Sequence, residues 1–387
     1  MKVWPKVKLR EVLALDLHKE SIDPSKRYEM VGVLSFGKGL FGREPVEAGN
    51  TSYIYFLRLK EDHIVMSQLF GWEGALALCT SEYAGRYVSP QFPTFLCDSD
   101  RINRHYLGWV MRRPSFWNDL GSRAKGMGDR RRTLNPESLF ESETPLPPLS
   151  EQEALVARLD ALAEKNRQVE AHLFAVERDA EHLLALRFRD AIVDAPLQPM
   201  AEVAPSVRRP VEININTRYR ELGARSFGKG LFIKPDFDGA EATWQKPVWI
   251  NSGDLVLSNI KAWEGAIAIA GEKHDGCIAS HRYITCVPDP ERATASFLAY
   301  YLLSQDGLEK VGLASPGTAD RNRTLSLGNL GKIKVPTPPL AVQKTFDRLQ
   351  AEIVALKAKH TAIREANAAV LPATLERVFS AGAPAHA

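Results

Sequence analysis

Two lysines that lie between glycines are the first candidates for chemistry. Lys38 and Lys229 occupy the centre of the same heptapeptide, S-F-G-K-G-L-F. Glycines allow backbone N–H groups to approach an anion closely, and the lysine adds a positive charge. Because Arg43 and Lys234 extend that charge, we expect both turns to contact phosphate groups. The alternative is a tight turn whose lysine is merely solvated.

A second set of candidates lies in two glycine-containing, turn-rich stretches that are dense in arginine. The set comprises Arg123, Lys125, Arg130, Arg131 and Arg132 in the first stretch, and Arg321, Asn322 and Arg323 in the second. Such loops suit contacts to DNA phosphates or base edges. The alternative is a loop that forms salt bridges back to its own domain.

A third set surrounds a repeated W-E-G-A tetrapeptide. Gln68 and Asn259 precede the tetrapeptides at matching positions, and Lys261 follows Asn259. Glutamine and asparagine side chains read adenine in the major groove, although a hydrogen bond at a strand edge fits equally well. For Trp72 and Trp263 themselves, packing at the end of a strand is favoured over base stacking.

Catalytic motifs are missing. The sequence has no N/D-P-P-Y/F loop of a methyltransferase, no G-x-x-x-x-G-K-[ST] phosphate loop, and no E-x-K or D-x-K beside a P-D dipeptide. Its four cysteines show no C-x-x-C pair and no zinc-ligand spacing. We therefore expect a chain with no catalytic site, no metal and no cofactor.

The bulk composition limits the class of protein. Apolar residues make up 44% and charged residues 25% of 387 residues, as in globular proteins with sizeable cores. The net charge is only +3, so any positive surface for DNA must be local. Neither a secretory signal nor a membrane span is visible, and we expect a cytoplasmic protein with reduced cysteines.

The chain is an internal repeat. S-F-G-K-G-L-F begins at residues 35 and 226, and W-E-G-A begins at residues 72 and 263, both with an offset of 191 residues. D-R-R-R-T-L at 129–134 and D-R-N-R-T-L at 320–325 keep the same offset, as do two P-P-L-x-x-Q segments. Arg131 thus aligns with Asn322, a difference that suits base discrimination. Two copies of one unit predict a pseudo-two-fold protein with a two-part target.

The fold class that we expect is α+β, with two tandem mixed α/β domains and two long helices. In the second copy, strands are predicted at Val248–Ile250, Asp254–Ser258, Ala266–Ala270 and Cys277–Cys286, and a helix at Ser296–Ser304. The expected boundaries are 1–147 for the first domain, 148–195 for a central helix, 196–338 for the second domain and 339–387 for a C-terminal helix.

Both long helices carry an apolar a/d seam. The seam positions proposed for partner docking are Leu155, Leu159, Leu162 and Val169 in the first helix, and Phe346, Leu349, Ile353 and Leu356 in the second. Further seam positions are Leu173, Val176, Ala180, Leu183, Ile363 and Val370, and the polar ones Asn166, His360 and Asn367 would fix the register. An antiparallel coiled coil is favoured over packing of each helix on its own domain, and a helix of roughly 40 residues would be about 60 Å long.

The ends of the helices carry their own signals. Ser150 and Glu153 form an S-x-x-E capping box after the prolines, which predicts the start of the first helix. Pro196 marks its end, and Pro372 is expected to kink or interrupt the second helix.

Several segments resemble the specificity subunits of Type I restriction–modification systems. They are P-P-L-S-E-Q (147–152), the helix endings at 183–192 and 370–379, and the domain openings V-K-L-R-E-V (7–12) and P-M-A-E-V-A (199–204). The individual motifs are loose, but their order and duplication cover essentially the whole chain.

The resemblance implies a mechanism for phage defence. Each target-recognition domain would read one half of a bipartite site in double-stranded DNA, and the helices would set the gap and dock two copies of an adenine methyltransferase subunit. A motor–endonuclease subunit would complete the complex. Two other functions remain open on the residues alone: a stand-alone sequence-specific DNA-binding repeat protein, and a protein–protein scaffold.

Overall fold

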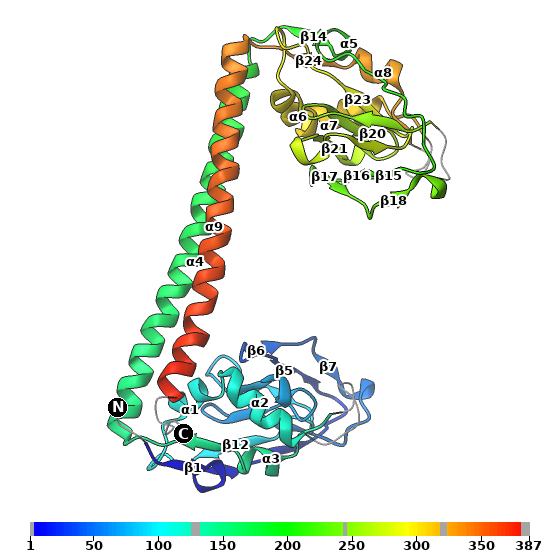
Figure 1. The fold of residues 1–387 in the computed structure, drawn as a ribbon. Coiled ribbons are helices and arrows are strands. Elements are labelled where there is room, and N and C mark those ends of the chain that lie inside the picture. The colour runs from blue at the N-terminus through cyan, green and yellow to red at the C-terminus, as the bar shows by residue number, and fades with distance from the viewer. Residues whose placement is uncertain (1–3, 125–131, 243–245, 318–322, 381–387) are drawn as a thin grey trace. The chain divides into compact units, whose positions relative to one another are not determined.

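The chain forms two compact units that each combine an α/β domain with parts of two long helices (Figure 1). A computed structural model describes residues 4–124, 132–242, 246–317 and 323–380. The first unit is Met1–Phe174 with His360–Ala387, and the second is Ala175–Lys359. The expected fold class, with mixed α/β domains and two long antiparallel helices, is confirmed.

The first domain is built from short antiparallel strands. Its largest sheet has the order β10 (Leu76–Leu78), β9 (Ile64–Met66), β12 (Thr94–Cys97) and β2 (Leu13–Leu15). A second sheet has the order β11 (Tyr87–Val88), β8 (Tyr55–Arg58) and β3 (Lys19–Ser21). The remaining pairs are β5 (Val31–Leu34) with β6 (Gly39–Gly42), β4 (Arg27–Tyr28) with β7 (Val46–Glu47), and β1 (Lys6–Lys8) with β13 (Glu143–Pro145). Its helices are α1 (Arg104–Val110), α2 (Pro114–Arg123) and α3 (Pro136–Phe140).

The second domain repeats this order of elements. Its three-stranded sheet is β21 (Ile267–Ile269), β20 (Leu255–Ser258) and β23 (Tyr283–Cys286). The pairs are β19 (Val248–Ile250) with β22 (Cys277–Ala279), β16 (Leu222–Ala224) with β17 (Leu231–Ile233), β15 (Arg218–Tyr219) with β18 (Phe237–Asp238), and β14 (Leu197–Pro199) with β24 (Lys334–Pro336). Its helices are α5 (Met200–Val203), α6 (Ala295–Leu303), α7 (Gln305–Leu313) and α8 (Leu327–Lys332). The strands predicted at Val248–Ile250, Asp254–Ser258 and Ala266–Ala270 and the predicted helix are therefore confirmed to within a residue or two, whereas the run Cys277–Cys286 is two strands, β22 and β23, in different sheets.

Backbone pairing keeps the offset of the sequence repeat. The hairpin β5–β6 pairs Gly32 with Phe41, and the hairpin β16–β17 pairs Gly223 with Phe232. A Cβ atom on either glycine would lie within 2.6 Å of the opposing phenylalanine ring. The shared glycine is therefore required for the ring to lie across the hairpin.

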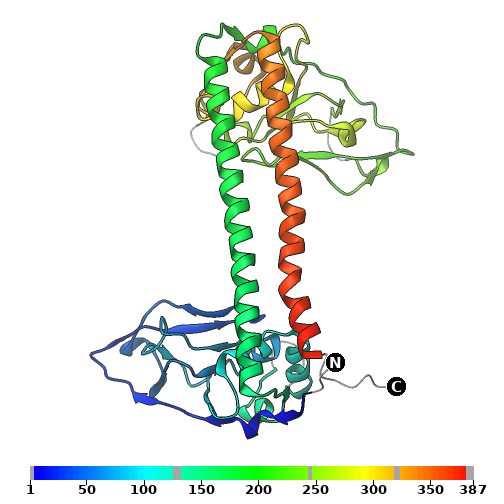
Figure 2. The ribbon, with the colours of Figure 1, turned by 90° about the vertical axis from the view of Figure 1, so that its left-hand side faces the viewer.

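The long helices are α4 (Leu149–Ile192) and α9 (Leu340–Ser380), and parts of both lie side by side in each unit (Figures 1 and 2). In the first unit Asn166 Nδ2 donates to the carbonyl oxygen of Asn367 at 3.2 Å, and Asn367 Nδ2 donates to that of Asn166 at 3.2 Å. In the second unit Lys357 forms an ion pair with Glu181. The reciprocal asparagine pair supports the prediction that polar seam residues fix the register.

Packing of the helices on the domains accompanies their pairing. Leu159 of α4 and Leu375 and Phe379 of α9 join the core of the first domain, whereas Phe188 of α4 and Phe346 of α9 join the core of the second. The two arrangements treated as alternatives at the sequence level therefore coexist. Each unit closes its core with one end of each helix.

Most of the predicted seam is buried or half-buried, including Leu173, Val176 and Ala180 in the second half of α4, but four of its positions are exposed. Leu155, Leu162, Leu349 and Leu356 are half-buried, and Leu159, Phe346 and Ile353 are buried. Val169, Leu183, Ile363 and Val370 are exposed. Toward the helix ends Leu184, Phe188 and Leu375 are buried and Leu371 is half-buried. In this part of α4 the buried positions are spaced by eleven residues, or three turns, as between Leu173 and Leu184. The spacing differs from the heptad because the helix ends pack on a domain as well as on the other helix.

Two predictions about the helix ends need correction. Because α4 begins at Leu149, Ser150 lies inside the helix and does not cap it. Pro372 does not interrupt α9, which continues to Ser380; a kink at this proline stays a prediction.

Instead, a buried glutamine ties each helix start to its domain. Gln152 accepts the N–H of Asn103 at 2.7 Å and donates to the carbonyl oxygens of Arg101 and Pro147 at 3.1 and 2.7 Å. Its counterpart Gln343 makes the same three bonds in the second unit, to Thr294, Arg292 and Pro338. The repeated P-P-L-x-x-Q segment is thus a helix–domain clamp.

All four cysteines are free thiols. Burial raises the pKa of Cys79, Cys97 and Cys286 to about 12, so these thiols are unreactive. Among the described helices, none is both long enough and apolar enough to cross a bilayer.

Candidate nucleic-acid interface

The turn at the tip of hairpin β5–β6 is strapped to the W-E-G-A segment. Phe36 N–H donates to the carbonyl oxygen of Glu73 at 2.8 Å, and Gly37 N–H donates to that of Gly74 at 3.0 Å. The Ser35 hydroxyl donates to the Glu73 carboxylate at 3.1 Å. Glu73 ends a 3-10 helix, η3 (Gly71–Glu73), between β9 and β10. Two motifs that are far apart in sequence are therefore one structural unit.

The second domain builds the same unit with almost the same distances. Phe227 N–H donates to Glu264 O at 2.8 Å, Gly228 N–H to Gly265 O at 2.9 Å, and Ser226 Oγ to the Glu264 carboxylate at 3.0 Å. The carboxylate also accepts from Lys261 Nζ at 2.6 Å, and this hydrogen bond lowers the pKa of Glu264, which is therefore ionised. The strap is thus duplicated in detail.

The arginine-rich stretch joins this unit in both domains. Leu134 N–H donates to the carbonyl oxygen of Gln68 at 2.8 Å, and Leu325 N–H donates to that of Asn259 at 2.7 Å. The guanidinium of Arg132 lies over the ring of Trp72, 5.5 Å from its centroid. In the second domain Arg323 lies over Trp263 at 4.5 Å. Three repeated motifs therefore converge, and we call each set of turn, Trp-Glu segment and arginine stretch a composite surface.

An exposed aromatic side chain stands at the tip of each turn, and sequence reasoning missed it. Phe36 is 57% and Phe227 75% exposed, although exposure of a large apolar ring is unfavourable. Both have positive φ, 63° and 61°, a conformation that is strained for a non-glycine residue. Strain of this kind persists at functional sites. The identity of this residue in both copies was the available signal.

The lysines of the turns are exposed, but the proposed role of the turn backbone is wrong in part. The N–H groups of Phe36 and Gly37 bind the Trp-Glu segment, so they are not available to a phosphate. Lys38 Nζ and Lys229 Nζ lie 5.8 and 5.7 Å from the centroids of the neighbouring phenylalanine rings. Neither lysine is ion-paired within the described part of the chain. The ammonium groups, rather than the backbone, are the groups left for an anion.

Several other predicted DNA-binding cations are engaged within the protein. Lys234 pairs with Glu221 at 2.7 Å and Arg123 with Asp119 at 3.0 Å. Arg323 Nη2 donates to the carbonyl oxygen of Gly312 at 2.9 Å. For Arg123 and Arg323 the alternative of a bond back to the domain is the one observed, and Lys261 likewise pairs with Glu264 of its own domain.

Arg43 is exposed, and its aliphatic stem covers Gly32. The remaining candidates, Lys125, Arg130, Arg131, Arg321 and Asn322, lie outside the described residues. The part of the composite surface that the structure describes therefore offers Lys38, Lys229 and Arg43 as its available cations.

The indoles are half-buried rather than free stacking platforms. Trp72 packs against the core of the first domain, and its Nε1 donates to the carbonyl oxygen of Leu69 at 2.9 Å. Trp263 Nε1 donates likewise to Ile260 at 3.1 Å. Since an arginine covers a face of each ring, packing is the principal role of both tryptophans.

The two residues proposed to read adenine differ in their surroundings. The side-chain oxygen of Asn259 is buried and has no hydrogen-bond partner among the described residues. It borders a cavity of about 320 Å³ that Arg208, His281 and Tyr283 also line. A buried unpaired acceptor is costly unless a ligand satisfies it. Gln68 is half-buried, and its backbone holds the arginine stretch.

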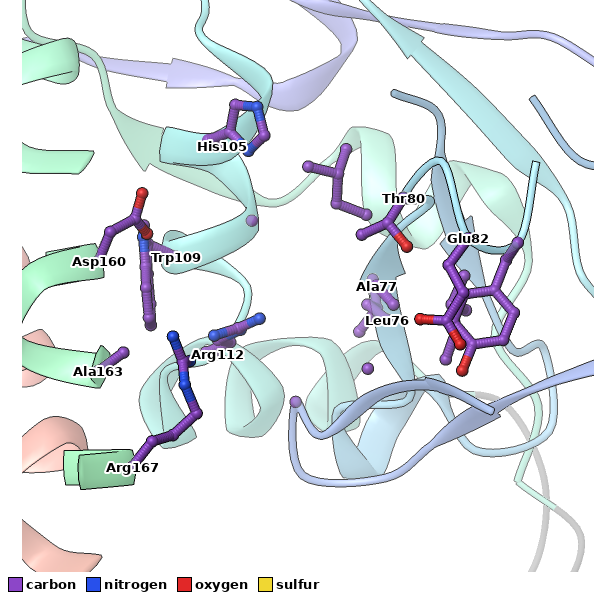
Figure 3. A pocket seen from close by; sticks show the side chains of 16 residues that line it. Leu76, Ala77, Thr80, Glu82, His105, Trp109, Arg112, Asp160, Ala163 and Arg167 are labelled. Carbon is purple, nitrogen blue, oxygen red and sulfur yellow. The ribbon is translucent and has the colours of Figure 1, made fainter. Parts of the chain in front are cut away.

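A further pocket of about 590 Å³ lies on the other side of the first turn, between that turn, α1 and α4 (Figure 3). Arg112 lies over Trp109 at 4.4 Å, and Trp109 Nε1 donates to Asp160 at 2.9 Å. Arg167 points toward Arg112 from α4 (Figure 3). At the positions that match Trp109, Arg112, Asp160 and Arg167, the second copy has Tyr300, Leu303, Ala351 and Ala358. The pocket is therefore specific to the first unit and is not part of the duplicated surface.

Comparisons place this fold in a known class. No protein-family model and no curated protein matches the sequence. Over nearly its whole length, however, the chain has the fold of solved type I restriction–modification subunits.

Two of these solved structures cover nearly the whole of both chains. One concerns complex assembly and conformational transition of the type I restriction–modification system; its TM-score is 0.71 at 18% identity, over 99% of both chains. The other is the HsdS subunit from Thermoanaerobacter tengcongensis, with a TM-score of 0.63 at 17% identity over 99% of this chain and 98% of that one.

Proposed function

We propose that this chain is the DNA sequence-recognition subunit of a Type I restriction–modification complex. Each domain reads one half of a bipartite double-stranded target through its composite surface. The chain itself is non-catalytic, and the associated methyltransferase and motor–endonuclease subunits supply the chemistry. We place the complex in the cytoplasm.

The duplicated composite surface is the observation that carries this proposal. An exposed aromatic and an exposed lysine stand on a strained turn in both domains, and both turns are fixed by the same three hydrogen bonds. A rigid cationic tip suits the sequence-independent part of DNA binding, in which lysines neutralise phosphates. Its occurrence in two copies suits a target in two halves.

Base discrimination belongs to positions at which the two copies differ. Because phosphate contacts carry no sequence information, residues shared by both copies position the DNA and unshared ones read it. Gln68 against Asn259 is such a difference within the described residues, and Arg131 against Asn322 is another in the sequence. The unpaired oxygen of Asn259 favours a donor on the ligand, such as the exocyclic amine of adenine.

The helices provide the surface on which two methyltransferase subunits dock. Phe174 of α4 is 67% exposed in the first unit, and Val354 of α9 is 64% exposed in the second. In the second unit a groove of about 710 Å³ lies between α4 and α9, lined by Ala191, Val342 and Leu349 among others. Apolar side chains exposed on paired helices favour a protein partner. The repeat counterparts of Phe174 and Val354 are Glu365 and Ala163, so the two docking surfaces differ in detail.

Co-expression with the partner methyltransferase tests the proposal. We expect a complex of two methyltransferases per chain by mass determination, and adenine methylation at one split motif by genome-wide mapping. The double variant Lys38→Ala/Lys229→Ala separates the two roles, because it should leave the mass of the complex unchanged and reduce methylation at all motif copies alike.

Either alternative function gives a different result. A chain that binds one DNA sequence tightly by itself and forms no complex would be a stand-alone DNA-binding protein. A chain that forms a complex but shows no DNA affinity at low salt, alone or in the complex, would be a scaffold.

A further inference from the structure

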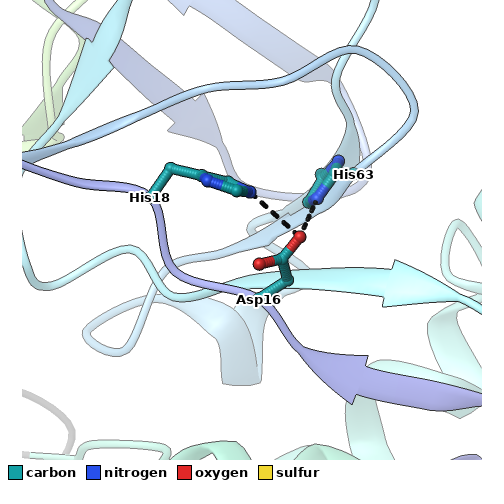
Figure 4. A group of neighbouring side chains, drawn as sticks. All are labelled: Asp16, His18 and His63. Atoms are coloured by element: carbon teal, nitrogen blue, oxygen red, sulfur yellow. Dashed lines mark hydrogen bonds and ion pairs between the residues drawn. The ribbon is translucent and has the colours of Figure 1, made fainter.

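Three side chains meet at one point of the first domain (Figure 4). Asp16 follows β2, His18 precedes β3, and His63 precedes β9. Asp16 Oδ2 lies 3.0 Å from His18 Nε2 and 2.9 Å from His63 Nε2. All three ligand-type atoms lie within 4.8 Å of one another. No spacing in the sequence predicted this group, because the residues become neighbours only in the folded domain.

The contacts of His63 aim its Nε2 at the Asp16 carboxylate. Its Nδ1 lies 3.2 Å from the carbonyl oxygen of Glu61, which can only accept, so Nδ1 carries the hydrogen. Nε2 faces the Asp16 carboxylate at 2.9 Å, and a carboxylate also only accepts, so a proton or a metal ion lies between these two atoms. His63 is only 5% exposed, so the ring is held in this orientation.

The second domain fills the same position with a different pair. The repeat aligns Asp16, His18 and His63 with Val207, Arg209 and Asp254. The local backbone is equivalent, since Asp16 N–H donates to Thr94 O at 3.0 Å and Val207 N–H donates to the matching Thr285 O at 2.8 Å.

In the second domain an ion pair between Arg209 and Asp254 occupies this position. Arg209 binds both carboxylate oxygens of Asp254, at 2.8 and 3.1 Å, and Asp254 is 2% exposed. In each domain a charged link thus joins the segment at 16–18 or 207–209 to the strand that starts at residue 64 or 255. At the matching positions the first domain has no guanidinium and presents imidazole nitrogens and a carboxylate instead.

We propose that Asp16, His18 and His63 bind a divalent transition-metal ion of the zinc class, which links the two segments as the Arg209–Asp254 pair does in the second domain. Two imidazoles and one carboxylate suit Zn²⁺, Co²⁺ or Ni²⁺ and do not suit Mg²⁺ or Ca²⁺, which take oxygen ligands. A tetrahedral ion with bonds of about 2.0–2.1 Å separates its ligand atoms by about 3.3 Å, so small side-chain movements suffice. The Glu61 carbonyl orients His63 from behind, as partners of metal-bound histidines do.

Asp16 and His18 are partly exposed, which leaves an entry path and a fourth position for water. The proposed role is structural, because the group joins two segments of the same domain.

Metal binding by the full chain, after removal of metal with a chelator, tests the proposal. Co²⁺ is the spectroscopic probe and Zn²⁺ the calorimetric one. We expect one ion of either metal per chain, visible absorption bands of a four- or five-coordinate Co²⁺ that Zn²⁺ abolishes, and a higher melting temperature with Zn²⁺.

The repeat supplies a matched variant. Asp16→Val/His18→Arg/His63→Asp transplants the residues of the second domain, and should abolish metal binding while the metal-free melting temperature is kept. His172→Ala/His182→Ala removes two exposed histidines of α4 and should leave binding unchanged. If the transplanted chain does not fold, His18→Ala, at a partly exposed position, gives the same spectroscopic test.

Absence of the cobalt bands in the parent chain would overturn the proposal. So would one-ion binding that survives the transplant or the His18→Ala change. Neither result would bear on DNA recognition, because the test measures no DNA binding.

Discussion

Replacement of Gln152 by methionine is the sharpest test of how the helices are joined to the domains. The side chain is fully buried and makes three hydrogen bonds, to Asn103 N–H and to the carbonyl oxygens of Arg101 and Pro147. Methionine keeps the volume and removes all three. At about 1 kcal/mol for each bond, the start of α4 should lose about 3 kcal/mol against local opening.

Amide hydrogen exchange measures this loss at the atom concerned. The N–H of Asn103 is bonded to the Gln152 side chain, so its exchange should accelerate about a hundredfold, since 1.4 kcal/mol corresponds to a factor of ten. Gln343→Met should do the same at Thr294 and leave Asn103 unchanged, and Gln168→Met on the exposed face of α4 should change neither.

Exchange at Asn103 that stays within about twofold of the parent chain, well below the factor of ten set by 1.4 kcal/mol, would refute the reasoning. The glutamine of the repeated P-P-L-x-x-Q segment would then not hold the start of the helix to the domain.

Three further predictions concern the composite surfaces and the seam. Lys38→Ala/Lys229→Ala should lower the slope of log K against log salt by about 2, roughly 0.9 for each phosphate contact, for all DNA sequences alike; a loss confined to one base pair would mean that the turn reads sequence. Phe36→Gly/Phe227→Gly removes the backbone strain of two positive-φ residues, so the free energy of unfolding should rise or stay within about 1 kcal/mol. The DNA affinity of the complex should fall; an unchanged affinity would show that the two rings do not contact DNA. Leu162→Asp places a charge at a half-buried seam position and should abolish methyltransferase binding in pull-down and mass measurements, whereas an intact complex would place the docking surface elsewhere.

The sequence predicted best those features that depend on neighbouring residues or on the internal repeat. The second domain's strands were predictable because apolar runs such as Leu255–Ser258 are separated by turn residues. The helices followed from their periodicity, and the duplication followed from a constant offset. The cap of α4 was assigned to Ser150 because Ser150 and Glu153 have capping-box spacing, whereas the helix begins one residue earlier, at Leu149, directly after a proline.

The candidate site was only partly predictable. Sequence reasoning found Lys38 and Lys229 because the turns are identical, but it assigned phosphate contacts to the backbone of the glycines, and the N–H groups of Gly37 and Gly228 are bonded to Gly74 and Gly265. It counted Lys234 as an available charge, although Glu221 neutralises it. Ion pairs between residues on different strands depend on pairing that no local pattern encodes.

The sequence by itself determined that this protein is a duplicated α/β chain with two long helices, because repetition and hydrophobic periodicity are properties of the order of residues alone. Tertiary structure decided which residues meet. It brought Ser35 to Glu73, stacked Arg132 on Trp72, and gathered Asp16, His18 and His63 at one point. Tertiary structure also decided that Phe188 of α4 is buried, because a helix that packs on a domain as well as on a second helix buries the face that covers the most apolar surface.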